Sequence, residues 1–145
     1  VFEKLAAGME LALPNLGMET LHHVHADDVA QLFMRALANW SNAVGQSFHA
    51  VSPAALTLRG YAHHVAGWFG REARLTFMPW DAWRQTVTAE EAQMTWDHIA
   101  HSPNCSMAKA QRLLGYEPRY SSLEAIYESL SWLIDHGIVS APSLY

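Results

Sequence analysis

Apolar residues recur at helical spacing along most of the chain, and this pattern predicts its main helices. The strongest case begins at Asp27 or Asp28, either of which can serve as the N-cap, and ends near residue 40. Its apolar face is formed by Val29, Leu32, Phe33, Ala36, Leu37 and Trp40. A face of this width predicts a helix that packs against a core.

Further helices are predicted where a Ser or Thr stands directly before an apolar-periodic run. These helices begin at Thr57, Thr88, Ser106 and Ser121. Thr88 and Ser121 are each followed three residues later by a glutamate, which is the sequence pattern of a capping box. The run after Ser121 has the most regular apolar face and should end at Gly137. Residues 1–7 predict the last turns of one more helix, and residues 81–86 predict a weak one.

Four short stretches have strand character instead. They are Met9–Leu13, Thr20–His25, Gln46–Val51 and Arg74–Phe77, of which Gln46–Val51 is expected to be buried. Strands this few and this scattered do not make an ordinary stand-alone sheet, so they would fit better in a sheet that belongs mostly to other sequence. The predicted fold class is therefore α/β, a helix-rich α+β arrangement of four or five helices with a few short strands, in a single domain over residues 1–145.

The amino-acid composition excludes some classes of binding partner and favours one cellular compartment. Half of the residues are hydrophobic and 16% are charged, which is typical of a globular protein. The net charge is −5 and no Lys/Arg cluster exists, so nucleic acid is not expected as a partner. No apolar run approaches the ~20 residues that a membrane span needs. The single cysteine, Cys105, excludes an internal disulfide and favours a reducing, cytoplasmic location. Val1 stands in what resembles the middle of a helix, which predicts that the natural chain begins upstream.

Two motifs suggest catalytic chemistry but favour structural roles. His23 and His25 have the spacing of metal ligands on a strand, but the barrel hydrolases that use this spacing need about 250 residues. A metal-dependent hydrolase therefore remains only a third alternative, and we expect no metal site. His25 and Asp28 are expected instead to orient the strand-to-helix turn. Ser106 and Lys109 match the Ser-x-x-Lys nucleophile motif without its companion motifs, so Ser106 is expected to cap a helix.

Tryptophan and histidine gather near a proline break in the second half of the chain. Such side chains often line a pocket, because they offer flat apolar area with a polar tip. The predicted substrate-binding residues are Asn15, Trp83, Trp96, His98 and His101. The alternative, in which the tryptophans fill the core and the histidines are exposed, stays open. No glycine-rich turn opens a helix and no Tyr is followed four residues later by Lys, so no cofactor-binding or catalytic residues are expected in this chain.

Four motifs, in the same order along the chain, resemble those of one known family. Val24-His-Ala-Asp-Asp-Val-Ala30 resembles the His-Val-x-Asp-(Val/Leu)-Ala signature of the extended short-chain dehydrogenases/reductases, the NAD-dependent epimerase/dehydratase family. The strand stretch at 46–51, with Ser-Pro and Leu-Thr after it, is similar to that family's next strand and helix opening. The stretch 106–118 is similar to its late Asp-x-x-Lys-Ala…Leu-Gly-x-x-Pro segment. The matches cover residues 1–137.

The resemblance implies the C-terminal substrate-binding portion of an extended Rossmann-type enzyme. The N-terminal NAD(P)-binding Rossmann portion, with its catalytic Tyr-x-x-x-Lys, would be absent from this chain. The complete enzyme would be an epimerase/dehydratase or a carbonyl reductase that acts by hydride transfer with NAD or NADP. This portion alone would bind no cofactor and be inactive. Its partners would be the missing Rossmann portion and a small-molecule substrate, a sugar or another hydroxyl or carbonyl compound; a homodimer stays open.

Departures from the family pattern affect the expected substrate. Many nucleotide-sugar members have arginines that bind the diphosphate, and Leu21 and the stretch 96–103 stand where two of them would be. Losing two bidentate arginine contacts weakens diphosphate binding, so a nucleotide sugar is not favoured. The competing hypothesis is a self-sufficient helical binding or interaction module without catalysis.

Overall fold

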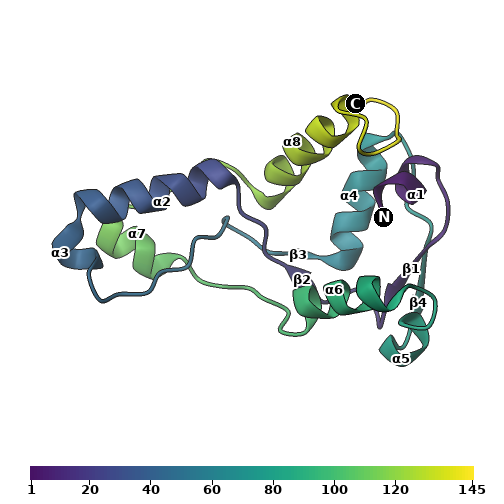
Figure 1. Ribbon diagram of the computed structural model, residues 1–145, viewed down its shortest axis with the longest axis horizontal. Coiled ribbons are helices and arrows are strands. Elements are labelled where there is room, and N and C mark those ends of the chain that lie inside the picture. The colour runs from purple at the N-terminus through teal and green to yellow at the C-terminus, as the bar shows by residue number, and fades with distance from the viewer. The chain divides into compact units, whose positions relative to one another are not determined.

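The structure is a computed structural model that describes residues 1–145, and it contains eight helices and four short strands (Figure 1). The helices are α1 (Phe2–Ala6), α2 (Ala26–Ala38), α3 (Trp40–Ala43), α4 (Leu58–Trp68), α5 (Trp80–Trp83), α6 (Ala89–Ile99), α7 (Ala108–Leu114) and α8 (Ser122–Asp135). The strands are β1 (Leu11–Pro14), β2 (Thr20–Leu21), β3 (Leu56–Thr57) and β4 (Leu75–Met78).

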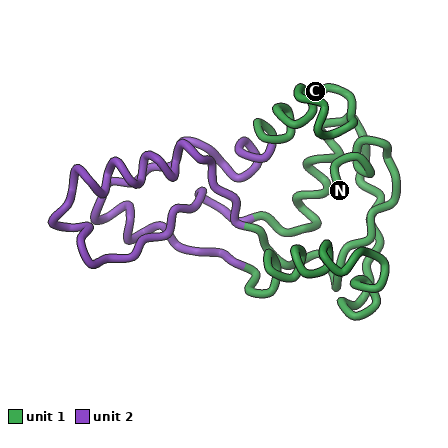
Figure 2. The backbone as a smooth tube through the Cα atoms, viewed as in Figure 1, with its two compact units in different colours: residues 1–21, 56–102, 127–145 green, residues 22–55, 103–126 purple.

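The chain divides into two compact units, each made of segments that are distant in sequence (Figure 2). Unit 1 comprises residues 1–21, 56–102 and 127–145, and unit 2 comprises residues 22–55 and 103–126. Both units are parts of one continuous chain, so the single domain expected over residues 1–145 stays a prediction.

Unit 1 contains all four strands, in two separate pairs. Strands β1 and β4 are parallel, with Leu11 opposite Leu75 and Pro14 opposite Met78. Strands β2 and β3 are antiparallel and only two residues long. Helix α4 begins where Thr57 accepts a hydrogen bond from the backbone N–H of Gly60, at 3.0 Å. The fully buried residues of α4 are Ala62, Val65 and Ala66, and they form part of the apolar interior of this unit.

Unit 2 is built around α2 and α7. Leu32 of α2 packs with Ala110 and Leu114 of α7 and with Tyr116, which is completely buried. The Tyr116 hydroxyl donates to the carbonyl of Val51 at 3.1 Å. Burial, together with the nearby Asp28 carboxylate, raises the pKa of Tyr116 to about 12, so this hydroxyl keeps its proton at neutral pH.

The helical pattern of the sequence predicts most of the observed helices. Helices α4, α6 and α8 begin within a residue of the expected caps, and the capping box of Thr88 and Glu91 forms as expected. The helix-rich α/β class is confirmed. The helix count exceeds the expected four or five because α1, α3 and α5 are single turns of four or five residues.

Three local predictions are wrong. The N-cap of α2 is His25 rather than Asp27 or Asp28, because the imidazole Nδ1 of His25 accepts the N–H of Asp27 at 3.1 Å. The strand expected at residues 20–25 ends at Leu21. The buried strand expected at Gln46–Val51 does not form: the stretch has no secondary structure, because unit 2 contains no other strand with which it could pair.

Candidate functional site

The carboxyl ends of β1 and β4 lie at the same edge of their parallel pair, and Asn15 organises that edge. Asn15 has a left-handed backbone (φ 49°), which asparagine tolerates better than most residues. Its N–H donates to the carbonyl of Met78 at 2.6 Å, and its side-chain oxygen accepts the N–H of Trp80 at 3.2 Å. Its side-chain amide also donates to Glu19. Asn15 therefore positions the first residue of α5 against the end of β1.

Three tryptophans form a row of contacts next to this edge, with Trp80 touching both Trp83 and Trp96. The rings of Trp80 and Trp83 are stacked with centroids 5.3 Å apart, and Trp80 is tilted against Trp96 with centroids 5.1 Å apart. Trp83 is buried, and its indole N–H donates to the carbonyl of Ala12 in β1 at 2.9 Å. Trp96 of α6 is 47% exposed. Trp83 thus anchors the cluster to the strands, while Trp96 presents aromatic surface to solvent.

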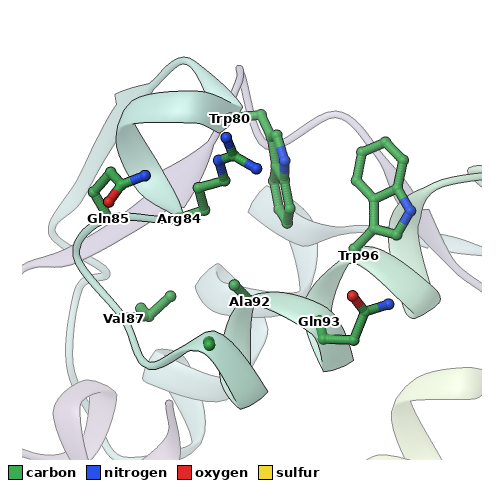
Figure 3. A pocket seen from close by; sticks show the side chains of 8 residues that line it. Trp80, Arg84, Gln85, Val87, Ala92, Gln93 and Trp96 are labelled. Atoms are coloured by element: carbon green, nitrogen blue, oxygen red, sulfur yellow. The ribbon is translucent and has the colours of Figure 1, made fainter.

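A cavity of about 780 Å³ opens between α5 and α6, beside this cluster (Figure 3). It is lined by Trp80, Arg84, Gln85, Val87, Ala89, Ala92, Gln93 and Trp96. Figure 3 shows the Trp80 and Trp96 rings on one side, with Arg84 and Gln85 following α5 and Gln93 projecting from α6. Aromatic walls with a few amide and guanidinium groups are the usual lining of a small-molecule site.

Two of the polar side chains that line the cavity, Arg84 and Gln93, already have partners within the chain. The Arg84 guanidinium lies 3.3 Å from the carboxylate of Asp81, and both side chains are more than half exposed. The Gln93 amide donates to Asp97 at 2.8 Å. The positive charge of Arg84 is partly balanced, so the cavity offers hydrogen-bonding groups more than a strong net charge.

The predicted substrate-binding residues take different places around this cavity. Trp96 lines it, Trp83 lies behind Trp80, and Asn15 fixes the start of α5. His98 and His101 are exposed and do not line it; His98 instead contacts the carbonyl of Met94, at 2.6 Å.

Sequence reasoning missed the polar lining of the cavity and the central position of Trp80. Arg84, Gln85 and Gln93 carry no motif that marks them. Trp80 follows Pro79 directly, and that proline break was the one available signal.

His25, Asp28 and Ser106 lie in unit 2 and contact backbone groups. The Asp28 carboxylate is completely buried and accepts the N–H groups of Arg119 at 2.8 Å and Tyr120 at 3.1 Å. The His25 ring stacks on Tyr120 with centroids 3.9 Å apart. The Ser106 hydroxyl accepts the N–H of Ala108 at 3.2 Å, although Met107 is the N-cap of α7. These contacts hold turns in place.

No group of three or more His, Cys, Asp or Glu side chains lies close enough to hold a metal ion. The ring of His22, for example, is occupied by two hydrogen bonds to the backbone. Its Nδ1 accepts the N–H of Cys105 at 3.1 Å, and its Nε2–H donates to the carbonyl of Ser52 at 2.9 Å. Both ring nitrogens are used within the chain.

The residues present do not fit a dinucleotide either. Such a cofactor places its pyrophosphate on free N–H groups where a strand turns into a helix. Three such junctions are present, and at β2–α2 the imidazole of His25 takes the N–H of Asp27. The other two are β3–α4 and β4–α5. At the first, Thr57 takes the N–H of Gly60, and a Cβ on Gly60 would lie 3.1 Å from the Thr57 hydroxyl. At the second, Asn15 takes the N–H of Trp80.

The fold of this chain matches part of several solved epimerase structures, although its sequence matches no characterised family. No family model and no curated protein matches the sequence. Among solved structures, the epimerase Mth375 from Methanothermobacter thermautotrophicus matches 94% of this chain with a TM-score of 0.67 and 20% identity, over 36% of its own length. This chain has the fold of part of an epimerase.

Two epimerases from Bacillus cereus match in the same way. The UDP-N-acetylglucosamine 4-epimerase matches 99% of this chain with a TM-score of 0.61 and 21% identity, over 41% of its own length. The UDP-glucuronic acid 4-epimerase, solved with UDP-glucuronic acid and NAD, matches 91% with a TM-score of 0.60 and 18% identity, over 38% of its length. The chain therefore spans about two fifths of these epimerases, and the resemblance inferred from its motifs is confirmed at the level of the fold.

Proposed function

We propose that this chain is the C-terminal, substrate-contacting portion of an NAD(P)-dependent epimerase/dehydratase or carbonyl reductase. The observation that carries the proposal is the fold match, which covers nearly all of this chain but only 36–41% of the epimerases. The complete enzyme would transfer a hydride reversibly between the cofactor and a substrate carbon that carries a hydroxyl or carbonyl. The catalytic Tyr and Lys and the NAD or NADP site would lie in the N-terminal Rossmann portion, so this chain alone would bind no cofactor and be inactive.

The tryptophan-lined cavity is the proposed substrate contact in this chain. The Trp80 and Trp96 rings offer flat apolar surface that can cover one face of a sugar or other ring. The Gln85 and Gln93 amides can donate to or accept from hydroxyl groups, and Arg84 can donate to a carbonyl or an acidic group. The role of these residues is to bind and orient the substrate and to exclude water from it.

The substrate proposed here is a small polar ring compound. The Bacillus cereus neighbours are named for UDP-sugars, and those names support a sugar as one member of the class. Leu21 and the arginine-free stretch 96–103 argue against strong diphosphate binding. His98 and His101 stay proposed contacts for a longer substrate, since both are exposed on or just beyond α6.

The remaining proposals concern location and partners. None of the eight helices is long and apolar enough to cross a membrane. The lone thiol of Cys105 supports a cytoplasmic location. The composition supports a small molecule and the Rossmann portion as partners rather than nucleic acid, and a homodimer of the complete enzyme stays open.

The substrate role of the cavity can be tested in the complete gene product. Replacing Trp96 by Ala removes an exposed aromatic wall, and the loss of one aromatic stacking contact costs about 1–3 kcal/mol of binding, which corresponds to a rise in KM of about fivefold or more. Trp132→Ala is the matched control, because Trp132 of α8 is 53% exposed and does not line the cavity. Equal KM values for the two variants would contradict the assignment.

A second experiment tests the proposal that the cofactor binds to the Rossmann portion and not to this chain. Calorimetric titration of NAD into the chain alone is expected to give no heat of binding, whereas the complete gene product is expected to bind NAD. Micromolar NAD affinity of the chain alone would contradict the proposal. Under the competing hypothesis of a self-sufficient interaction module, the complete gene product would also fail to bind NAD.

A further inference from the structure

Glu19 lies in the loop between β1 and β2, and its carboxylate contacts a residue beside the tryptophan-lined cavity. One oxygen, Oε1, accepts a side-chain N–H of Asn15, four residues earlier. The other oxygen, Oε2, is buried and has no hydrogen-bond partner. A buried carboxylate oxygen without a donor costs stability, so this side chain points to a role other than folding.

The loop that carries Glu19 is fixed to the start of α4, within unit 1. The carbonyl of Glu19 accepts the N–H of Leu58, and the carbonyl of Gly17 accepts the N–H of Arg59, each at 2.9 Å. The Arg59 guanidinium also donates to the carbonyl of Leu16 at 3.0 Å. These three contacts hold the Glu19 carboxylate at a fixed place beside Asn15.

Helix α5 depends on contacts from outside for its position. It is a single turn of four residues, and its N-cap residue, Pro79, makes no side-chain capping bond. A helix this short is not stable by itself, so its neighbours decide where it lies. Asn15 Oδ1 accepts the N–H of Trp80 at 3.2 Å, and the Trp83 indole donates to the carbonyl of Ala12 at 2.9 Å. Asn15 thus supplies the cap that Pro79 does not.

The orientation of the Asn15 amide decides whether this cap exists. Its oxygen must face the N–H of Trp80, because an inverted amide would present a second donor there. An ionised carboxylate only accepts hydrogen bonds, so Glu19 selects the orientation in which the NH₂ of Asn15 faces it. A glutamine at this position offers a donor as well as an acceptor, and would leave both orientations available to Asn15.

We propose that Glu19 is a positioning residue of the tryptophan-lined cavity. Acting through Asn15, its carboxylate fixes Trp80, whose ring centroid lies 5.3 Å from that of Trp83 and 5.1 Å from that of Trp96. Trp80 and Trp96 form the aromatic wall of the cavity, which Glu19 itself does not line (Figure 3). The inference rests on the proposed function in one respect, that this cavity contacts the substrate.

Circular dichroism of the indole transitions, measured on the complete gene product, reports where these rings lie. Neighbouring indoles that are oblique to one another couple and give a pair of bands of opposite sign in the far ultraviolet. Trp80 is oblique to both of its neighbours, at 27° to Trp83 and 48° to Trp96. The difference between the spectra of the native protein and of Trp80→Phe isolates the Trp80 signal from that of other tryptophans.

Reversing the polarity of the contact tests the role of Glu19. Asn15→Asp keeps an acceptor for the N–H of Trp80 and tolerates the left-handed backbone, but it places two carboxylates together. About half or more of the Trp80 signal should be lost, because like charges at this separation repel. Adding Glu19→Gln should restore the signal, since the glutamine amide then donates to the new carboxylate. Adding Glu72→Gln instead gives the same net charge at an exposed site outside this loop, and should restore nothing.

Glu19→Gln alone tests the same role without a pair of like charges. It should lower the Trp80 signal in part, because both orientations of the Asn15 amide become available. An unchanged signal in this variant, or equal restoration by Glu19→Gln and Glu72→Gln, would overturn the proposal. Recovery of the Tm without recovery of the Trp80 signal would also overturn it, since Glu19 would then only stabilise the loop.

The outcome is separable from that of the proposed function. A Trp80 signal that follows the Asn15–Glu19 contact, in a complete gene product that does not bind NAD, would support the positioning role and refute the proposed function. A signal that is indifferent to Glu19, in a product that binds NAD, would refute the positioning role alone.

Discussion

At the scale of single residues, Asp28 shows how one buried carboxylate joins distant parts of unit 2. Its two oxygens accept the N–H groups of Arg119 and Tyr120, which lie 91 and 92 residues further along the chain. A buried charge is tolerated only when such donors satisfy it. The sequence predicts that Asp28 orients a turn, but a partner 91 residues away leaves no local signal, so Arg119 could not be identified in advance.

Replacing Asp28 by Asn should destabilise the chain by about 2–3 kcal/mol, because the amide can accept from only one of the two N–H groups and turns a donor toward the other. Urea unfolding followed by circular dichroism measures the change. Asp27→Asn is the control: Asp27 contacts Arg119 at 3.4 Å with both side chains more than half exposed, so its loss should cost less than about 1 kcal/mol. Equal costs would show that the buried contacts of Asp28 are not what stabilises this turn.

The three tryptophans show a second limit at this scale. Composition and the proline break indicate that tryptophans and histidines of residues 80–101 belong to a pocket. Which of them touch depends on the register of β1 against β4 and on the contact of Asn15 with Trp80. These contacts join residues about 65 positions apart, so periodicity could not separate Trp96 from His98.

At the scale of elements, helix starts are predictable because their causes are local. The capping box of Ser121 and Glu124 spans four residues: the N–H of Ser121 donates to the Glu124 carboxylate at 2.7 Å, and the N–H of Glu124 donates to the Ser121 hydroxyl at 3.2 Å. Strands depend on pairing with distant sequence, so Gln46–Val51 has the pattern of a strand without forming one. Both outcomes follow from where the hydrogen-bond partners lie.

The Ser121 capping box predicts a pH dependence. Hydrogen bonds from the N–H of Ser121, and then from its hydroxyl, hold the pKa of Glu124 below its ordinary value of 4.5. A depressed folded-state pKa stabilises the protein above the unfolded-state pKa, and this contribution is lost as pH falls through the folded-state value. The difference in unfolding free energy between the native chain and Glu124→Gln should therefore be present near pH 7 and be lost as the pH falls below 4.5, through the lowered folded-state pKa of Glu124. Glu117→Gln, whose side chain takes no part in a cap, should show no such change; a pH-independent difference for Glu124→Gln would contradict the assignment.

At the scale of the whole molecule, the fold class and the family resemblance could be predicted from the sequence, because both depend on the order of motifs along the chain. The cavity between α5 and α6 could not be predicted from the sequence, because its shape depends on how these two helices and the turn between them are placed. Nor does the sequence show that α2 has an uncovered face. The apolar positions Val29, Phe33 and Leu37 predict burial, and only the packing of unit 2 reveals that Phe33 and Leu37 stay exposed.

This exposure should be measurable in the chain alone. The chain should bind the dye 8-anilinonaphthalene-1-sulfonate, because the dye fluoresces on exposed apolar surface. Leu37→Lys should reduce the fluorescence without lowering the Tm, since Leu37 is 62% exposed. Trp132→Lys, on α8, serves as a control for the loss of one exposed apolar side chain elsewhere. A reduction no larger than that of the control would show that this face of α2 is not the main dye site.

The interleaving of the two units has a genetic consequence. The chain passes from one unit to the other at residues 21/22, 55/56, 102/103 and 126/127. Unit 1 includes both ends of the chain, so a break at any single position divides it, and no contiguous stretch of the gene encodes it. A single crossover with a related gene anywhere within residues 1–145 would therefore combine parts of unit 1 from two parents. Exchanging unit 2 alone would require four crossovers, one at each of these four boundaries.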